Sequence, residues 1–321
     1  MNFKRPRLDL LTNSHLNTIL PVYLTQLEPN YVRERIDIPD GDFIDLDWVN
    51  PDIIDAPTFV LFHGLEGNSR SHYAKRIMYY LEQQKWRGVV VHFRGCSEEI
   101  NRLPRAYHAG DTFDLEWILG EIRLRTPHKL FAAGVSLGGN ILLKYLGEKG
   151  ALQNIVDAAM AVSVPFDLAI CNEELERGFN KHVYVKHFMD TLLPKMQHYA
   201  KNSSKLSYAK SKIQTFSEFN DTFISPMFDF KDNEDYCRST SCRQYLIHIA
   251  TPTLILQAKN DPMVPLSAWP TKEELSPYIR FVGTKTGGHA GFLSLTRNYK
   301  QALLKFPKIL VDYCLQFVDD D

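Results

Sequence analysis

Residues 134–138 read Gly134-Val135-Ser136-Leu137-Gly138 and lie between an apolar run, 129–133, and a stretch with helical spacing, 139–144. A strand, then G-x-S-x-G, then a helix is the context that a nucleophile elbow requires. Glycine is needed two residues before and after Ser136 because side chains there would strike the neighbouring strand and helix. The turn exposes the Ser136 hydroxyl. It also places the Leu137 N–H at the start of a helix, where the helix dipole favours an oxyanion.

The composition argues against several classes of protein. The chain has 321 residues, with 37 basic and 38 acidic side chains and a net charge of −1 at pH 7. Because this balance creates no strong overall field, we expect no nucleic acid as a partner. The sequence has no signal-peptide pattern and no apolar run of about eighteen residues. We therefore expect no transmembrane helix and a cytoplasmic protein, whose oligomeric state the sequence leaves open.

The five cysteines are an odd number and are widely scattered in the sequence. This pattern is typical of free thiols in a reducing compartment. Cys237 and Cys242 are near neighbours, but no cluster of His or Cys residues completes a four-ligand metal site around them. We expect no metal and no organic cofactor.

Patterns of buried strands alternate with helical patterns along most of the chain. A hairpin with one solvated face is expected over 32–49, and buried strands are expected at 57–62, 88–93, 130–133, 157–164, 252–258 and 278–283. Helices are expected at 14–21 (ended by Pro21), 71–84, 111–125, 267–275 and 298–317. Such alternation implies right-handed βαβ units. The predicted fold is α/β, with a mostly parallel sheet of about eight strands flanked by helices.

The strand patterns stop between residues 166 and 245, which are rich in charge, aromatic residues and helix formers. A stretch this long is not a loop in a compact domain, so we expect a helical cap insertion over the sheet. Peripheral membrane contact through this cap stays open. The rest of 1–321 is expected to be a single domain, with 1–30 packing on it. The basic stretches 181–187 and 195–212 are interpreted as solvated faces.

A serine nucleophile needs a base, and the base needs an orienting carboxylate. In a doubly wound sheet, functional residues collect at the carboxyl ends of strands. Asp261 follows the strand predicted at 252–258, and His289 follows the strand predicted at 278–283. The order Ser136, Asp261, His289 is the order found in α/β hydrolases. We interpret these three residues as a catalytic triad.

Each residue also has a simpler interpretation. Taken singly, Asp261 could cap a turn before Pro262, and His289 is one of 11 histidines. The joint occurrence of the right residue types, in the right order, after the right strands favours the triad. Asp229 and Asp235 are rival acids, but both fall within the predicted cap.

A second oxyanion donor is expected from the loop after the strand at 57–62, which reads His63-Gly-Leu-Glu-Gly67. Gly64 permits a tight turn, which leaves the Leu65 N–H as the donor beside the Leu137 N–H. We interpret His63 as a structural residue that holds this loop. Among neighbouring candidates, Cys96 is interpreted as a lining thiol, and Asp111 and Asp114 as partners of a helix N-terminus. Apolar lining of an acyl pocket is a candidate role for Met160, Met189, Met196 and Met227.

The sequence resembles AB hydrolase family 4, the YheT-like α/β hydrolases related to the medium-chain fatty-acid ethyl ester synthase/esterases of yeast. The resemblance covers nearly the whole chain and is carried by the motifs at 14–21, 63–67, 93–97, 102–111, 134–139, 258–262 and 287–292. It implies the α/β-hydrolase fold, and its charge-relay residues fall on Ser136, Asp261 and His289. It also implies a substrate class, carboxylic esters with short to medium acyl chains. Asn260 stands where the family often has a paired aspartate, which leaves Asp261 as the acid.

These observations predict a serine carboxylesterase that forms an acyl-enzyme on Ser136 and acts on a small-molecule ester. An acyltransferase that passes the acyl group to an alcohol on the same triad is the nearest alternative. A hydrolase-like binding module without catalysis is a third interpretation, and the presence of all three triad residues argues against it. Dehalogenase and epoxide-hydrolase chemistry is disfavoured because it uses aspartate at the elbow.

Overall fold

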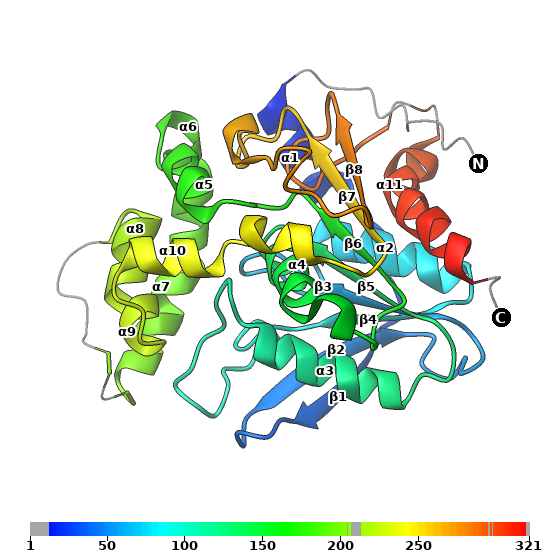
Figure 1. The fold of residues 1–321 in the computed structure, drawn as a ribbon, viewed down its shortest axis with the longest axis horizontal. Helices are drawn as coiled ribbons and strands as arrows, with labels where there is room; N and C mark the ends of the chain where they lie inside the picture. The colour runs from blue at the N-terminus through cyan, green and yellow to red at the C-terminus, as the bar shows by residue number, and fades with distance from the viewer. Residues whose placement is uncertain (1–12, 204, 207–212, 295, 297, 319–321) are drawn as a thin grey trace.

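The computed structural model describes residues 13–318 except 204, 207–212, 295 and 297. Its centre is an eight-stranded sheet in the order β1-β2-β4-β3-β5-β6-β7-β8 (Figure 1). The strands are β1 Val32–Asp37, β2 Phe43–Val49, β3 Thr58–Phe62, β4 Arg87–Val91, β5 Leu130–Val135, β6 Ala158–Val162, β7 Thr253–Ala258 and β8 Ile279–Thr284. β2 is antiparallel to β1 and to β4, and every other neighbouring pair is parallel. The predicted α/β-hydrolase fold is confirmed.

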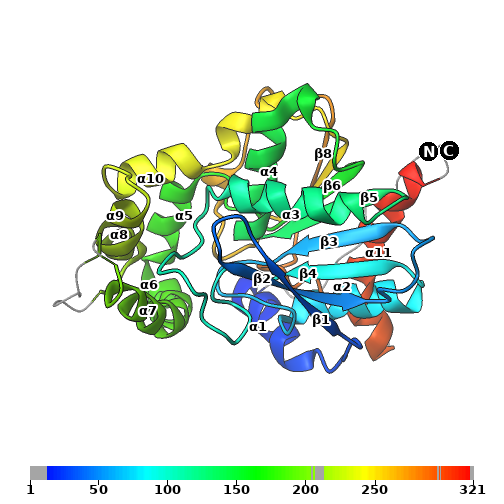
Figure 2. The same cartoon turned by 90° about the horizontal axis from the view of Figure 1, so that it is seen from below.

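Helices cover both faces of this sheet, α3 and α4 on one side and α2 and α11 on the other (Figure 2). The residues of strand β3 contribute to two hydrophobic cores, one on each face of the sheet. Val60 and Phe62 belong to the cluster under α3 and α4, whereas Phe59 and Leu61 belong to the cluster under α2 and α11. Because side chains alternate along a strand, a continuously apolar run fills both layers. The helices are α2 His72–Gln83, α3 Thr112–Leu124, α4 Leu137–Lys149 and α11 Tyr299–Cys314.

A second group of helices gathers at one end of the molecule (Figures 1 and 2). They are α5 Leu168–Leu175, α6 Gly178–Asn180, α7 Lys186–Ala200, α8 Phe216–Phe219, α9 Ser225–Met227 and α10 Asn233–Thr240. We call these six the cap helices. No strand occurs among the described residues between β6 and β7. The division of the chain into one domain, 1–321, with an insertion at 166–245 stays a prediction.

The N-terminal helix α1, Ser14–Leu24, continues past Pro21, where the sequence pattern predicted its end. Proline at this position removes the N–H that would bond to the carbonyl of Asn17. That carbonyl instead lies against Gly291 in the loop after β8, where a Cβ atom would overlap it. The helix thus tolerates an internal proline at a point of close contact with the main body. Residues 1–12 of the predicted 1–30 segment lie outside the described residues.

Two other local predictions were wrong. The helix expected at 267–275 is only a 3₁₀ turn, Leu266–Ala268, because Trp269 is extended (ψ 143°) ahead of Pro270, as a residue before proline prefers. The hairpin face expected to be solvated is buried along β2. Arg35 and Arg33 of β1 cover Asp45 and Asp47 there, each with an ion pair of 2.7 Å.

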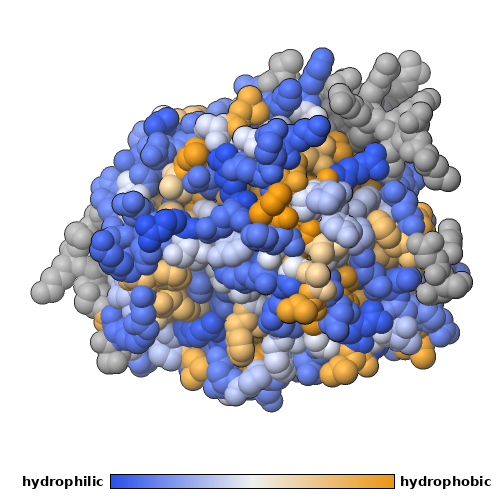
Figure 3. All heavy atoms as spheres, in the orientation of Figure 1, coloured by the Kyte–Doolittle hydropathy of each residue, from blue (hydrophilic) through white to orange (hydrophobic). Residues whose placement is uncertain are grey.

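The surface seen in Figure 3 is mostly hydrophilic, with apolar residues scattered over it. In the part of the chain that the structure describes, no helix combines the length and the apolar content needed to cross a bilayer.

Candidate active site

Ser136 stands between the end of β5 and the start of α4, with φ 54° and ψ −120°. A non-glycine residue in this region costs roughly 1–3 kcal/mol and is held there only by its surroundings. The Ser136 N–H donates to the carbonyl of Val162 in β6 (2.8 Å), and the Ser136 carbonyl accepts from the Asn140 N–H in α4 (3.0 Å). The strained turn is therefore fixed from both sides and has the geometry of a nucleophile elbow.

The two glycines of the elbow have the steric role that the motif predicts. A Cβ atom at Gly134 would overlap the backbone of Gly138, and one at Gly138 would overlap the carbonyls of Phe62 and His63. Strand β3, helix α4 and the turn could not come together with larger residues at these two positions. The sequence G-x-S-x-G is thus explained by packing in this chain.

His289 and Asp261 come together after two adjacent parallel strands, β8 and β7. The His289 Nδ1 lies 2.9 Å from Asp261 Oδ2 and 3.1 Å from Oδ1. Because a carboxylate only accepts, Nδ1 carries the proton and Nε2 is left as the basic nitrogen. Asp261 is buried, and its Oδ1 also accepts from the N–H groups of Met263 (2.9 Å) and Val264 (3.3 Å).

Ser136 and His289 line the same cavity. Within the described residues, no hydrogen bond joins the Ser136 hydroxyl to the imidazole or to any other group. In free enzymes such contacts are often long and tighten only when substrate binds. The structure therefore brings the three predicted residues into one site and leaves the serine hydroxyl open to the cavity.

A tight turn over residues 64–67 approaches the serine from the end of β3. A Cβ atom at Gly64 would lie 3.2 Å from that of Ser136. The turn is closed by the Gly67 N–H, which donates to the Gly64 carbonyl (3.0 Å), and Glu66 has a positive φ of 53°. Within the described part of the chain, the N–H groups of Leu65 and Leu137 have no hydrogen-bond acceptor. Both predicted oxyanion donors are thus free beside the elbow.

Two tyrosines hold this turn, and the sequence analysis did not identify them. The Tyr73 hydroxyl accepts from the Gly64 N–H (2.8 Å), and the Tyr107 hydroxyl accepts from the Glu66 N–H (2.7 Å). The amides on either side of Leu65 are therefore anchored while its own is free. No sequence pattern identifies a tyrosine that accepts a hydrogen bond from a turn amide, because the contact depends on tertiary packing.

His63 has the structural role expected for it. Its Nδ1–H donates to the Gly64 carbonyl (2.7 Å), and its Nε2 accepts from the Phe93 N–H (3.0 Å). Burial lowers the pKa of His63 to about 3, so the ring is neutral at pH 7. With both ring nitrogens occupied, His63 fixes the loop and is unable to act as a base.

Two hollows meet at Ser136. The first is a cavity of about 110 Å³ beneath the cap helices, with apolar walls that include Leu168, Leu175, Phe188, Leu192, Met196, Phe216, Phe219 and Ile224. The second is an open groove of about 660 Å³ that runs between α1 and the cap helices. Ser136, Leu65, Glu66 and His289 line both. The serine hydroxyl therefore stands at the junction of an apolar compartment and a solvent-open one.

Several other expectations need correction. Of the four methionines proposed as lining, only Met196 lines the cavity, where Met263 joins it. Cys96 lies behind the wall, where burial raises the pKa of its thiol to about 12. Asp111 precedes α3 without a side-chain cap and pairs with Arg105 (3.0 Å).

The rival acids lie elsewhere, in exposed ion pairs. Asp229 pairs with Lys205 and Asp235 with Arg238, each at 2.6 Å. Neither lines the cavity or the groove that meet at Ser136. Their positions in the cap region of the sequence had already argued against a role as the acid.

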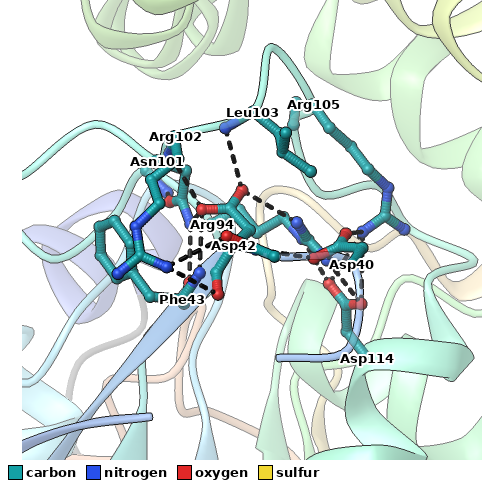
Figure 4. A network of polar contacts seen from close by, with 12 residues as sticks. Asp40, Asp42, Phe43, Arg94, Asn101, Arg102, Leu103, Arg105 and Asp114 are labelled. Carbon is teal, nitrogen blue, oxygen red and sulfur yellow. Dashed lines mark hydrogen bonds and ion pairs between the residues drawn. The ribbon is translucent and has the colours of Figure 1, made fainter. Parts of the chain in front are cut away.

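A buried ionic network supports the loop that forms one wall of the site (Figure 4). Arg94 lies between three carboxylates, at 2.8 Å from Asp40, 3.0 Å from Asp42 and 2.6 Å from Asp114. Arg105 joins the network through Asp114 (3.1 Å). Because these contacts pin both ends of residues 94–105, they fix the segment that leads directly to Tyr107.

Comparisons with known proteins agree with this geometry. Residues 57–294 match the family described as the α/β hydrolase fold. The chain belongs to this family. It is 37% identical over 313 residues to the Escherichia coli (strain K12) protein named "Putative esterase YheT", covering 94% of this chain and 91% of that protein. It is 32% identical to the human phospholipase ABHD3, covering 86% and 70%.

More distant similarities extend the same result. The chain is 30% identical to the monoacylglycerol lipase of Saccharomyces cerevisiae, covering 80% of this chain and 60% of that enzyme. Among solved structures, the Pyrococcus furiosus esterase Pf2001 aligns with a TM-score of 0.57 at 12% identity, covering 93% and 96%. At that identity the likeness shows the fold alone. Together the comparisons establish a hydrolase family with esterase-like and lipase-like members.

Proposed function

We propose that this chain is a serine carboxylesterase that hydrolyses short- to medium-chain acyl esters through an acyl-enzyme on Ser136. The observation that carries the proposal is the shared site of a strained, half-buried serine, an imidazole and the buried carboxylate that orients it, with two free amides beside them. The esterase and lipase names of its relatives supply independent support. No step requires a metal or an organic cofactor.

In this mechanism His289 Nε2 removes the proton of Ser136 as the hydroxyl attacks the ester carbonyl. Asp261 holds the imidazole in the tautomer with the proton on Nδ1 and stabilises the imidazolium that forms. The Leu65 and Leu137 N–H groups donate to the oxyanion of the tetrahedral intermediate. His289 then returns its proton to the leaving alcohol, and water hydrolyses the acyl-enzyme by the same steps.

The two hollows suggest how an ester would lie. An acyl chain fits the apolar cavity beneath the cap helices, where each buried CH₂ contributes about 0.8 kcal/mol. The alcohol part would then occupy the open groove, which places no tight limit on its size. The small volume of this cavity, about 110 Å³, supports a preference for short or medium chains over long ones.

Labelling with a fluorophosphonate probe tests the mechanism. We expect the wild-type protein to be labelled and the variants Ser136→Ala and His289→Ala to be unlabelled, with hydrolysis of p-nitrophenyl esters lost in parallel. A series of acyl lengths would give the chain-length preference. Product analysis with added ethanol separates hydrolysis from transfer to an alcohol. Esterase activity that survives in purified Ser136→Ala would contradict the proposal.

A further inference from the structure

The cap helix α7 places a charged lysine side chain, Lys195, in the wall of the site. Lys195 of α7 has its Nζ at 2.7 Å and 2.9 Å from the two carboxylate oxygens of Glu66. The side chains are only 11% and 8% exposed. By contrast, Lys186 at the start of the same helix pairs with Asp190 and is 69% exposed. The basic stretch that begins at 195 was expected to be a solvated face, and Lys195 departs from that expectation.

Glu66 belongs to the turn that presents the Leu65 amide. Its N–H donates to the Tyr107 hydroxyl, and that hydroxyl donates in turn to Glu66 Oε1 (3.0 Å). The carboxylate therefore receives the lysine from the cap and the tyrosine from the main body. The backbone of Glu66 is also strained, so these contacts hold a conformation that the residue would not otherwise prefer.

The Cys96 thiol also lies near the Lys195–Glu66 pair, but it does not compete with Glu66 for the charge of Lys195. The Cys96 thiol lies 3.7 Å from Lys195 Nζ and 3.9 Å from Glu66 Oε1. Burial holds the thiol in its neutral form, so Glu66 is the carboxylate that neutralises Lys195. An ion pair with this little exposure is costly to break, since each partner would be left as an uncompensated buried charge.

We propose that Lys195 is a positioning residue for the turn over residues 64–67, because its ion pair with Glu66 holds the Leu65 N–H in place. The Leu65 N–H is then correctly oriented as an oxyanion donor only when helix α7 is packed against the main body. This inference rests on the proposed esterase function. It couples the element that closes the acyl cavity to the group that stabilises the transition state. An oxyanion donor acts mainly on kcat, because the charge that it binds develops only in the transition state.

The test compares Lys195→Met with Lys201→Met, a control at an exposed lysine that directly follows the same helix and lines neither hollow. We expect Lys195→Met to lower kcat for a p-nitrophenyl ester by about 10- to 100-fold with KM little changed. Lys201→Met should leave both values unchanged. A higher KM at unchanged kcat would assign Lys195 to pocket shape and would overturn the proposal, as would unchanged kinetics.

A second variant separates positioning from the cost of one unpaired charge. Glu66→Gln combined with Lys195→Met removes both charges and keeps an acceptor for the Tyr107 hydroxyl. If the ion pair positions the turn, kcat stays low in the double variant while its melting temperature returns toward the wild-type value. Recovery of wild-type kcat would refute the coupling.

The link to the Leu65 amide has its own test. In a Leu65→Pro background, which lacks the amide proton, Lys195→Met should change kcat less than threefold. A full additional loss there would show that Lys195 acts elsewhere. The esterase function itself is judged separately by the inactivity of Ser136→Ala, so failure of the coupling is distinguishable from failure of the enzyme assignment.

Discussion

Replacement of Leu65 by proline removes one predicted oxyanion donor and little else. Proline is favoured at the second position of a β-turn, which Leu65 occupies between Gly64 and Glu66. Its N–H has no acceptor within the described residues, so no hydrogen bond of the folded protein is lost. The loss of one such donor costs about 2.7–4 kcal/mol in the transition state. We therefore expect kcat to fall about 10²- to 10³-fold while the melting temperature changes by only a few degrees.

The control is Leu65→Ala, which keeps the N–H and shortens a side chain that lines both hollows. This variant should alter KM and acyl-length preference with little change in kcat. Steady-state hydrolysis of p-nitrophenyl butyrate measures both variants, and thermal unfolding reports whether they fold. A folded Leu65→Pro protein that keeps kcat within about threefold of wild type would refute the assignment of this amide as a donor.

Three further predictions concern the acid, the buried network and the neutral histidine. Asp261→Asn should lower kcat about 10⁴-fold, because two backbone N–H groups at Oδ1 turn the amide NH₂ toward His289 and impose the wrong tautomer; a smaller loss in esterase assays would argue against the triad. Arg94→Met leaves Asp42 buried without its cation and should lower the unfolding free energy in urea by about 3–5 kcal/mol; an unchanged midpoint would contradict this. His63 has a folded pKa of about 3 against 6.5 unfolded, so the unfolded chain binds the extra proton between these values and stability falls with decreasing pH. His63→Gln should therefore reduce the slope of the unfolding free energy against pH, measured in urea below pH 6, by about 1.4 kcal/mol per pH unit. An unchanged slope would disprove the buried neutral state of His63.

The sequence was most informative where local pattern and fold impose the same constraint. A buried parallel strand must be apolar on both faces, so β3 and β7 could be predicted from composition alone. The elbow could be predicted because backbone contacts require its two glycines, Gly134 against Gly138 and Gly138 against the end of β3. Asp261 and His289 could be placed because strand ends in a parallel sheet share one edge.

The two wrong local predictions have different physical origins. The segment after β7 has helical spacing, yet Pro270 makes Trp269 extended and ends the turn. Asp45 and Asp47 alternate with apolar residues as if solvated, yet arginines from the neighbouring strand bury them. The effect of Pro270 is local, whereas the arginine partners of Asp45 and Asp47 lie on another strand and cannot be identified from residue spacing along the chain.

The contacts that support the turn were invisible for the same reason, and they are the part of the site that most needs structure. Tyr73, Tyr107 and Lys195 come from helix α2, the loop after β4 and the cap helix α7, and they contact the two residues on either side of Leu65. The triad is held by other contacts, such as those of the Ser136 N–H with the Val162 carbonyl and of the His289 N–H with Thr18 Oγ1. The free Leu65 amide, by contrast, depends on all three of these distant groups. The geometry of the triad can thus persist while the oxyanion donor is lost, which makes kcat, rather than labelling or folding, the quantity that reports whether this support is intact.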